Sequence, residues 1–297
     1  MFKNLATNIL IFTLTLIGSP QISATPIKFN DLTILVSSCD KYAPMWGPFF
    51  ASLFEQWPSL LQENNNVPVL LIANHKSYHN HRVTMINIPH ESSWADNMLS
   101  ALQQVNTKYV LIALDDYWIT QPVNETRLNE LYQTMQTEHA AMLQLSNHDP
   151  RYQDGQKHAT TSNLMYINKF AHYKVSLQLA IWDTEALKVL LRPGEDPWAF
   201  ELSGTARSHG YPQAFLSTNA DIPIRYLNAA HQGHINPAAI EYAKQHQIPF
   251  NYAGFPVLGK FNYKITYNTW KKRAQKLISF LQQPGSFYQS EYVQKKH

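Results

Sequence analysis

The stretch from Lys108 to Thr120 constrains the fold of this chain more than any other. It reads KYVLIALDDYWIT, in which the apolar residues 109–114 run directly into Asp115 and Asp116. A continuous apolar run of this length is typical of a strand buried on both faces of a parallel sheet. Open parallel sheets bind their ligands at the carboxyl ends of the strands. The two acids therefore indicate a divalent cation, although a polar turn that merely ends the strand would also explain them.

Shorter β-rich runs precede this stretch, and helical patterns separate them. The segments 32–36, 69–73 and 83–88 predict strands, while apolar residues recur at helical spacing over 46–57 and 95–105. Such alternation of strands and helices is typical of an α/β fold. We therefore expect an α/β protein with a mainly parallel central sheet and helices on both faces.

The second half of the chain is less regular. The segment SLQLAI at 176–181 predicts a strand, Asp183 is placed to cap a helix, and Pro197 is placed to begin another. A short helix is expected through Ile240. No further long apolar run occurs, so the second half adds fewer firm elements to the sheet.

Three segments are expected along the chain. Residues 1–24 contain Lys3, an apolar segment and a small-residue site that ends at Ala24, as secretory signal peptides do. This apolar segment is too short to span a bilayer, which takes about 20 apolar residues. Residues 30–258 show no internal repeat or low-complexity linker and predict one domain. Residues 259–297 predict a basic amphipathic tail, with eight Lys or Arg against one acidic residue.

Composition and missing motifs exclude several classes of protein. The single Cys39 rules out an internal disulfide and a cysteine zinc cage. The net charge is only +3 and basic residues gather in the tail alone, so no nucleic-acid partner is indicated. The chain lacks G-x-G-x-x-G, G-x-S-x-G and H-E-x-x-H. It also lacks the complete P-loop motif G-x-x-x-x-G-K-[ST], because the partial match GFPVLGK at 254–260 is followed by Phe261. Dinucleotide-binding, P-loop, α/β-hydrolase and zinc-protease sites are therefore unsupported.

Further polar residues fall at the ends of predicted elements. Asp40 follows the first strand, and a capping role for it is as plausible as a binding role. A later acidic segment, GEDPWAFE, holds Glu195, Asp196 and Glu201. These three acids can serve as general bases or can solvate the amino end of a helix. The last of these polar residues are His231 and His234, which could also be ordinary surface or core histidines.

In this order along an α/β chain, these sets resemble the GT-A family of nucleotide-sugar glycosyltransferases over about 33–234. LDDYW resembles the D-x-D motif of that family, with Asp116 matching the final metal-binding aspartate and Asp115 facing the ribose or sugar. Because the motif here is D-D, either acid is a candidate metal ligand. The resemblance implies a Rossmann-like GT-A sandwich in which Asp40 contacts the nucleotide. It further implies that a carboxy-terminal histidine, His231 or His234, completes the metal shell.

The resemblance implies an inverting, hexosyltransferase-type enzyme that moves a sugar from a nucleotide-sugar donor to a glycan or glycolipid acceptor. Mn²⁺ or Mg²⁺ would offset the charge of the diphosphate leaving group. A carboxylate base would take the proton of the acceptor hydroxyl, with Asp196 first, Glu201 second and Glu195 third among the candidates. Trp182 and Trp198 are candidates for stacking on an acceptor sugar, although tryptophan is more often a core residue.

A second hypothesis from another class is a non-catalytic glycan-binding or envelope protein that keeps a GT-A-like fold. The signal-like residues 1–24 favour export, whereas nucleotide sugars are made in the cytoplasm. If the segment is retained, it and the basic tail 259–297 would hold the protein at the cytoplasmic face of an anionic membrane. Export and peripheral membrane association therefore stand as alternative locations.

Overall fold

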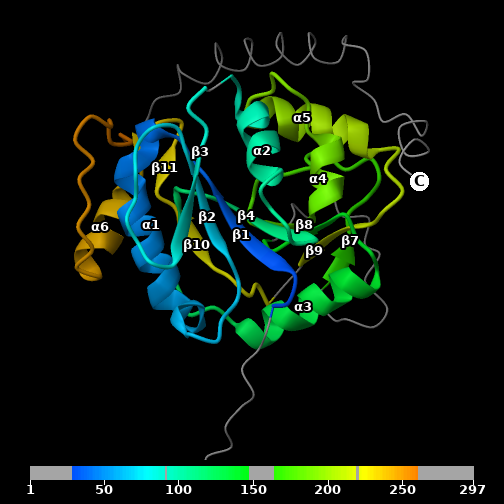
Figure 1. Ribbon diagram of the computed structural model, residues 1–297, viewed down its shortest axis with the longest axis horizontal. Helices are drawn as coiled ribbons and strands as arrows, with labels where there is room; N and C mark the ends of the chain where they lie inside the picture. The colour runs from blue at the N-terminus through cyan, green and yellow to red at the C-terminus, as the bar shows by residue number, and fades with distance from the viewer. Residues whose placement is uncertain (1–28, 91, 147–163, 219–220, 260–297) are drawn as a thin grey trace, which may run out of the picture.

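The fold is built around one central sheet (Figure 1). The computed structural model describes residues 29–90, 92–146, 164–218 and 221–259. Within these residues the sheet has eight strands in the order β3-β2-β1-β4-β8-β6-β9-β7. Their bounds are β1 Leu32–Ser37, β2 Val69–Ala73, β3 Val83–Asn87, β4 Tyr109–Leu114, β6 Met142–Gln144, β7 Leu164–Tyr166, β8 Ala180–Asp183 and β9 Phe215–Thr218. The signal-like segment 1–24 and all of the expected tail beyond Gly259 lie outside the described residues.

The half of the sheet from β3 to β4 is parallel. β1 pairs in parallel with β2 and β4, and β2 pairs in parallel with β3. β8 then runs antiparallel to both β4 and β6, β9 runs parallel to β6, and β7 lies antiparallel to β9 at the edge. Four of these seven pairings are parallel. The prediction of an α/β fold with a mainly parallel central sheet is therefore confirmed.

The apolar run that became β4 is buried on both faces, as its sequence predicts. Tyr109, Leu111 and Ala113 belong to one hydrophobic core, and Val110 and Ile112 belong to the other. Alternate residues of a strand point to opposite faces, so a strand between two cores must be apolar at every position. Burying each large apolar side chain contributes about 1.5–3 kcal/mol.

Helices cover both faces of the sheet (Figure 1). On one face lie α1 (Ala43–Gln56), α3 (Glu125–Thr137) and α6 (Pro237–Gln245), whose apolar sides join one core. On the other face lie α2 (Trp94–Leu102), α4 (Thr184–Leu190) and α5 (Pro197–Ser208), whose apolar sides join the second core. Two short 3-10 helices flank α1, at Asp40–Tyr42 and Pro58–Leu61.

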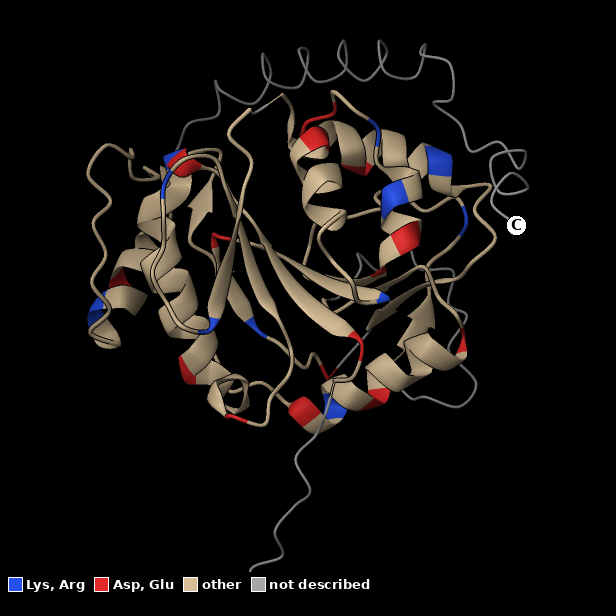
Figure 2. Cartoon of the chain, in the orientation of Figure 1, with Lys and Arg blue, Asp and Glu red and all other residues tan. Residues whose placement is uncertain are grey.

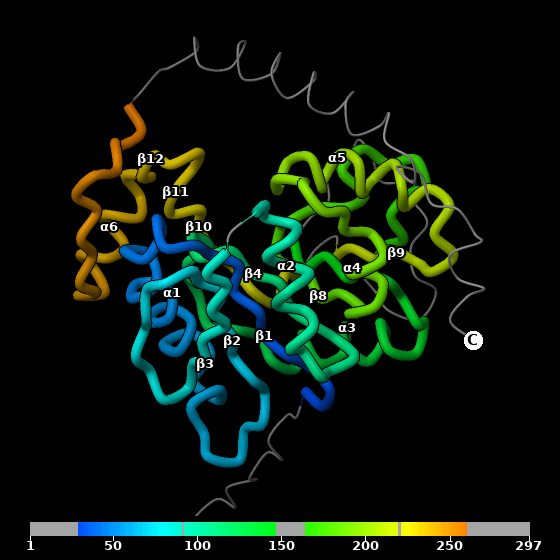
Figure 3. The backbone as a smooth tube through the Cα atoms, turned by 45° about the horizontal axis from the view of Figure 1, so that its top comes forward, coloured from blue at the N-terminus to red at the C-terminus, as the bar shows by residue number. Residues whose placement is uncertain are grey.

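The second half departs from the expected strand at 176–181. Regular pairing there begins only at Ala180, because the backbone N–H of Leu177 donates to Glu201 Oε1 at 2.8 Å rather than to a strand. Small ribbons complete this region: β5 (Tyr117–Ile119) pairs with β10 (Tyr226–Asn228), and β11 (Ala230–His231) pairs with β12 (His234–Ile235). In Figure 3 the β10 to β12 region and helix α5 lie on opposite sides of β4.

Charged side chains are dispersed over the described part of the molecule (Figure 2). Lys and Arg alternate with Asp and Glu on several helices rather than forming one basic stripe in the residues shown in colour. Among the described residues, none of the helices combines the length and the apolar character that crossing a membrane requires.

Candidate functional site

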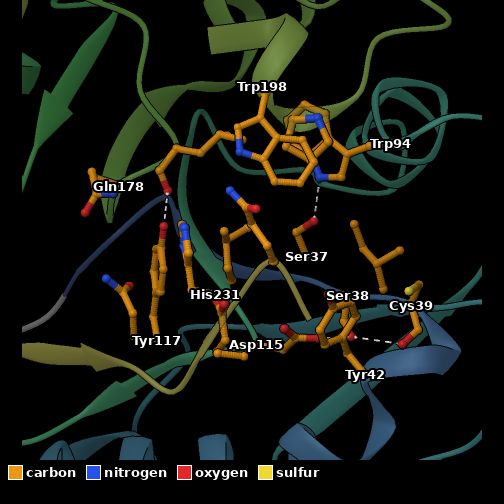
Figure 4. A pocket seen from close by; sticks show the side chains of 18 of the residues that line it. Ser37, Ser38, Cys39, Tyr42, Trp94, Asp115, Tyr117, Gln178, Trp198 and His231 are labelled. Atoms are coloured by element: carbon orange, nitrogen blue, oxygen red, sulfur yellow. Dashed lines mark hydrogen bonds between the residues drawn. The ribbon is translucent and has the colours of Figure 1, made fainter. Parts of the chain in front are cut away.

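A cavity of about 570 Å³ opens at the carboxyl ends of β1 and β4 (Figure 4). Segments that lie far apart in the sequence line it, among them the residues after β1, the residues after β4, helix α2, residues 177–178, the start of α5 and the region from β10 to the turn after β11. β1 and β4 are parallel neighbours, so their carboxyl ends meet at one edge of the sheet. The sheet topology therefore creates the site that the sequence of β4 indicates.

Asp115 lies at the floor of this cavity and is 5% exposed. Its Oδ2 accepts a hydrogen bond from Ser38 Oγ, and the indole N–H of Trp46 donates to that same hydroxyl oxygen at 2.6 Å. Burial and the neighbouring charge of Asp116 raise the pKa of Asp115 well above its usual value. One supporting hydrogen bond from Ser38 therefore holds the carboxylate in an environment that disfavours its charge.

Asp116 completes the acidic pair and also lines the cavity. Its Oδ1 atom is buried and has no hydrogen-bond partner among the described residues, while its backbone oxygen accepts from Ala229 N at 2.7 Å. Burial raises the pKa of Asp116 to about 7. A solvated polar turn would leave neither a buried orphan oxygen nor a raised pKa, so the ordinary explanation of this pair is disfavoured.

The acidic pair fits a hard divalent cation. Mg²⁺ and Mn²⁺ prefer carboxylate oxygens, and a bound cation would satisfy the orphan Oδ1 and offset the charge of both acids. In the described part of the chain, however, no group of three or more His, Cys, Asp or Glu side chains is arranged to hold a metal ion. The fit therefore rests on Asp115 and Asp116, with remaining ligands left to water or to a bound substrate.

The two predicted histidine ligands differ in position. His231 lines the cavity, whereas His234, its partner across the β11–β12 hairpin, does not. His234 Nδ1 lies 3.2 Å from the backbone oxygen of Gln232. Both turn residues of this hairpin, Gln232 and Gly233, have positive φ angles, as a type I′ turn requires. Only His231 is therefore near the acidic pair.

Among the three predicted base candidates, Glu201 alone lines the cavity. It is half-buried on α5, and its Oε1 accepts from the backbone N–H of Leu177 at 2.8 Å. Asp196 instead caps α5, with its Oδ1 accepting from Ala199 N at 2.8 Å. The capping explanation of Asp196 is the one that the geometry favours.

The surroundings of Glu195 do not support its predicted role as a base. Its side chain is 0% exposed, and its two oxygens accept from Arg207 Nη1 and Nη2 at 2.7 Å and 2.8 Å. Glu195 lies outside the residues that line the cavity. A buried carboxylate paired in this bidentate way stabilises the fold and cannot receive a proton from a substrate in the cavity.

Asp40 lies beside the cavity rather than in its lining. Its carboxylate accepts hydrogen bonds from the backbone N–H groups of Asn74, His75 and Lys76, which ties the end of β1 to the end of β2. Burial raises the pKa of Asp40, but these three hydrogen bonds lower it by more, so the pKa lies below its usual value. Asp40 therefore joins two strand ends rather than capping a helix, and neither the alternative capping role nor the predicted nucleotide contact is supported by its geometry.

The cavity also contains aromatic residues that the sequence did not single out. Tyr117 stacks on Tyr226 with ring centroids 4.5 Å apart, and the Tyr226 hydroxyl bonds to Gln178. Burial raises the pKa of Tyr226 to about 12, so its phenol stays neutral near pH 7. Trp94 donates from its indole N–H to Ser37 Oγ at 2.9 Å. Tyr226 supports Tyr117 from outside the lining, and only the position of Tyr117 and Trp94 in the fold identifies them as cavity residues.

The two tryptophans considered for sugar stacking differ in how far they are exposed. Trp198 is 41% exposed and lines the cavity beside Trp94 (Figure 4). Trp182 is 1% exposed and packs against Phe200 and Phe215 in the core. The suggestion that Trp182 stacks on a sugar is therefore wrong, and Trp198 keeps the accessible face that such a contact needs.

The likenesses to known proteins are distant. No family model and no curated protein matches the sequence. Among solved structures, S. aureus TarS 1-349 aligns with a TM-score of 0.44 at 14% identity, covering 67% of this chain and 59% of that one. The complexes of the same protein with UDP and with UDP-GlcNAc align with TM-scores of 0.42 and 0.44 at 13% and 12% identity. They cover 91% of this chain and 75% and 76% of TarS 1-349. Likenesses at this level assign no activity to this chain.

Proposed function

We propose that this chain is a metal-dependent glycosyltransferase that takes its sugar from a nucleotide-sugar donor. The observation that carries the proposal is the acidic pair at the carboxyl end of β4, in a cavity of about 570 Å³. Asp115 is buried, and Asp116 is half-buried with an Oδ1 atom that is itself buried and has no hydrogen-bond partner among the described residues. Asp116 and Asp115 would hold Mn²⁺ or Mg²⁺, which supplies positive charge to a departing diphosphate. A polar turn that merely ends the strand would not require Asp115 and the Oδ1 atom of Asp116 to be buried.

Two further residues of the cavity, Glu201 and Trp198, have separate roles in this proposal. Glu201, on α5, is the carboxylate that takes the proton of an acceptor hydroxyl during an inverting transfer. Trp198 offers an exposed ring at the same helix, suited to stack on a sugar of a glycan or glycolipid acceptor. Figure 4 shows Trp198 across the cavity from Asp115. Donor and acceptor would therefore approach from opposite walls.

Calorimetry with Asp116→Asn tests the cation site. The wild-type chain should bind one of UDP, GDP, ADP or CDP in the presence of Mn²⁺, and the variant should lose this cation-dependent binding. Asp221→Asn is a matched control, because Asp221 is an exposed acid that pairs with Arg127 away from the cavity. Binding that is equal in Asp116→Asn and in the control would overturn the assignment of the cation ligands.

A second measurement separates the base from the cation ligands. Glu201→Gln should retain binding of the nucleoside diphosphate with Mn²⁺ and should lower sugar transfer by about 100-fold or more, since a positioned base contributes roughly 10²–10⁴ in rate. The readout is release of nucleoside diphosphate from the nucleotide sugar in the presence of an acceptor. Unchanged turnover in Glu201→Gln would remove Glu201 from the mechanism.

A non-catalytic glycan-binding protein is the second candidate. It is favoured by the exposed Trp198 and by the lack, within the described ranges, of a ready three-residue metal set. This candidate predicts glycan binding that is insensitive to EDTA, with no donor hydrolysis for any nucleotide sugar. Cation-dependent release of a nucleoside diphosphate by the wild-type chain would eliminate it.

A further inference from the structure

A second cavity, of about 330 Å³, lies at the far edge of the sheet. It is lined by residues that follow β7, by Lys174, and by the connection 209–215 that leads from α5 into β9. β9 runs in the same direction as β4, because β8 is antiparallel to β4 and to β6, and β6 is parallel to β9. The start of β9 therefore lies at the end of the sheet opposite to Asp115. The two cavities share no lining residue.

Two lysines and one histidine, which can each carry a positive charge, line this second cavity. Lys174 is 4% exposed, and its Nζ donates to the backbone oxygen of Ser208 at 3.0 Å and lies 4.2 Å from the ring centroid of Phe215. His209 has a buried Nε2 without a hydrogen-bond partner in the described part of the chain. Lys169 is exposed at the rim, with its Nζ 5.7 Å from the centroid of Phe170.

The three groups are not balanced by acids. No Asp or Glu is among the residues that line the cavity, and no ion pair of the described residues involves Lys169, Lys174 or His209. Glu138, outside the lining, accepts from the hydroxyl of the lining residue Tyr166 at 3.1 Å. The cavity is therefore biased towards positive charge.

The pKa shifts of Lys174 and His209 agree with an excess of positive charge in this cavity. Burial and then the charge of Lys169 lower the pKa of Lys174 to about 8. Burial, and then the charges of Lys174 and Lys169, lower the pKa of His209 below its usual value. Each group thus makes protonation of its neighbours harder, and a bound anion would reverse this effect.

A purely structural role explains only one of the three. The Lys174 ammonium donates to a carbonyl at the carboxyl end of α5, where the helix dipole favours a cation. This contact does not require Lys169 or His209 near it, and both of them oppose its charge. It also leaves His209 Nε2 without a hydrogen-bond partner among the residues that the structure describes.

We propose that the second cavity binds an oxyanion, a phosphate or phosphate-monoester group, through Lys174, Lys169 and His209. The two ammonium groups are compact hydrogen-bond donors suited to phosphate oxygens, and His209 Nε2 donates to a third oxygen. The anion would satisfy the orphan nitrogen and neutralise the cluster. This site lies beyond the proposed glycosyl transfer and depends on none of its residues.

Calorimetric titration of the full chain tests the site. Inorganic phosphate and glycerol phosphate are titrated at pH 7 in buffer with EDTA and matched ionic strength, so that cation-bridged binding at the first cavity does not contribute. The wild-type chain should show saturable binding. Lys169→Gln and His209→Gln should each weaken it by about tenfold, the effect expected when one charge-assisted hydrogen bond is lost.

Matched controls keep the comparison specific. Lys244→Gln and His79→Gln change exposed residues of the same types away from the cavity, and both should leave phosphate binding unchanged. If Lys174→Met fails to fold, NMR of the wild-type chain still tests the cluster. The histidine signal that is missing in His209→Gln should move on addition of phosphate but not on addition of equal chloride.

The two ligands distinguish the source of the anion. Equal affinities identify free phosphate as sufficient, and clearly tighter binding of glycerol phosphate identifies a phosphate monoester; either result supports the site. Binding that is absent, that is reproduced by chloride, or that is equal in Lys169→Gln, His209→Gln and their controls would overturn it. None of these outcomes affects nucleoside diphosphate binding at Asp116. The phosphate site and the glycosyltransferase proposal can therefore be rejected independently of each other.

Discussion

At the residue scale, the carboxylate of Asp115 is held by the side chain of Ser38, which lies 77 positions away in the sequence. Ser38 donates to Asp115, and Trp46 donates to Ser38 at 2.6 Å, so the serine hydroxyl is oriented by a buried indole. Groups that hold cation ligands in place in this way affect affinity without touching the cation. Ser38 is therefore a positioning residue for the proposed cation site.

We expect Ser38→Ala to weaken cation-dependent nucleoside diphosphate binding by about tenfold, the lower end of the range for such supporting residues. The variant removes the side-chain hydrogen bond from Ser38 that favours the charged form of Asp115. Calorimetry with increasing Mn²⁺ measures the effect. Ser59→Ala is the control, since Ser59 donates to the carboxylate of Glu125 at 2.7 Å in an equivalent contact elsewhere. Equal affinities for the two variants would contradict the role of Ser38.

Also at the residue scale, Lys174 makes stability depend on pH. The folded chain releases the Lys174 proton near a pKa of about 8, whereas the unfolded chain keeps it up to the ordinary value of 10.5. Between these values the unfolded state binds more protons, so the free energy of unfolding rises with pH. Below pH 8 both states are protonated and this contribution is constant.

We therefore expect the wild-type chain to gain stability relative to Lys174→Met between about pH 8 and pH 10.5. The slope of the difference is at most about 1.4 kcal/mol per pH unit. Urea unfolding of both proteins at several pH values measures it. A difference that is flat over this interval would show that Lys174 does not titrate in the folded state at the lowered pKa.

At the scale of elements, helix α5 connects the two cavities and is anchored at both ends. Asp196 caps its amino end beside Trp198, and its carboxyl end delivers Arg207 to a buried ion pair with Glu195. Arg207 also donates from Nε to the backbone oxygen of Leu190 at 2.8 Å, which fixes α5 against the end of α4. The position of Glu201 in the first cavity depends on this anchoring.

We predict unequal costs for changing the two neighbouring acids. Glu195→Gln leaves the Arg207 guanidinium buried without its anion and should destabilise the chain by about 3–5 kcal/mol. Asp196→Ala removes one cap and should cost only about 1 kcal/mol. Denaturant unfolding compares the two variants directly. Equal costs would mean that the buried pair is not held as the structure shows it.

At the scale of the whole molecule, the first cavity lies where separate parts of the chain meet. Segments after β1 and β4, the start of α5 and the β10–β11 region all contribute to it. A ligand there contacts elements from both halves of the sheet. Binding should therefore stabilise the complete fold rather than one local element.

We expect a nucleoside diphosphate to raise the melting temperature only when Mn²⁺ or Mg²⁺ is present. At a ligand concentration of about 100 times Kd the gain is about 2.7 kcal/mol, and each kcal/mol corresponds to about 2–4 °C in a protein of this size class. Scanning fluorimetry with and without EDTA measures the shift. The same shift in EDTA, or in Asp116→Asn, would contradict cation-dependent binding.

Local patterns predicted the elements best where burial was unambiguous. The run 109–114 became β4, Asp183 caps α4 and Pro197 begins α5, as expected. The prediction of a strand over the whole of 176–181 failed because the side chain of Glu201, on α5, accepts the hydrogen bond from the backbone N–H of Leu177. A contact between residues 24 positions apart is invisible to a pattern of neighbouring residues.

The sequence by itself determined the α/β class, the strand at 109–114 and the placement of Asp115 and Asp116 at its carboxyl end. These follow from hydrophobic periodicity, which is a property of residues close together in the chain. Only the tertiary structure decided what each acid does. Asp40 bonds to backbone N–H groups after β2, Glu195 pairs with Arg207, and Asp116 keeps an orphan oxygen in the cavity. The role of a carboxylate depends on which partners reach it in space, and those partners come from distant parts of the chain.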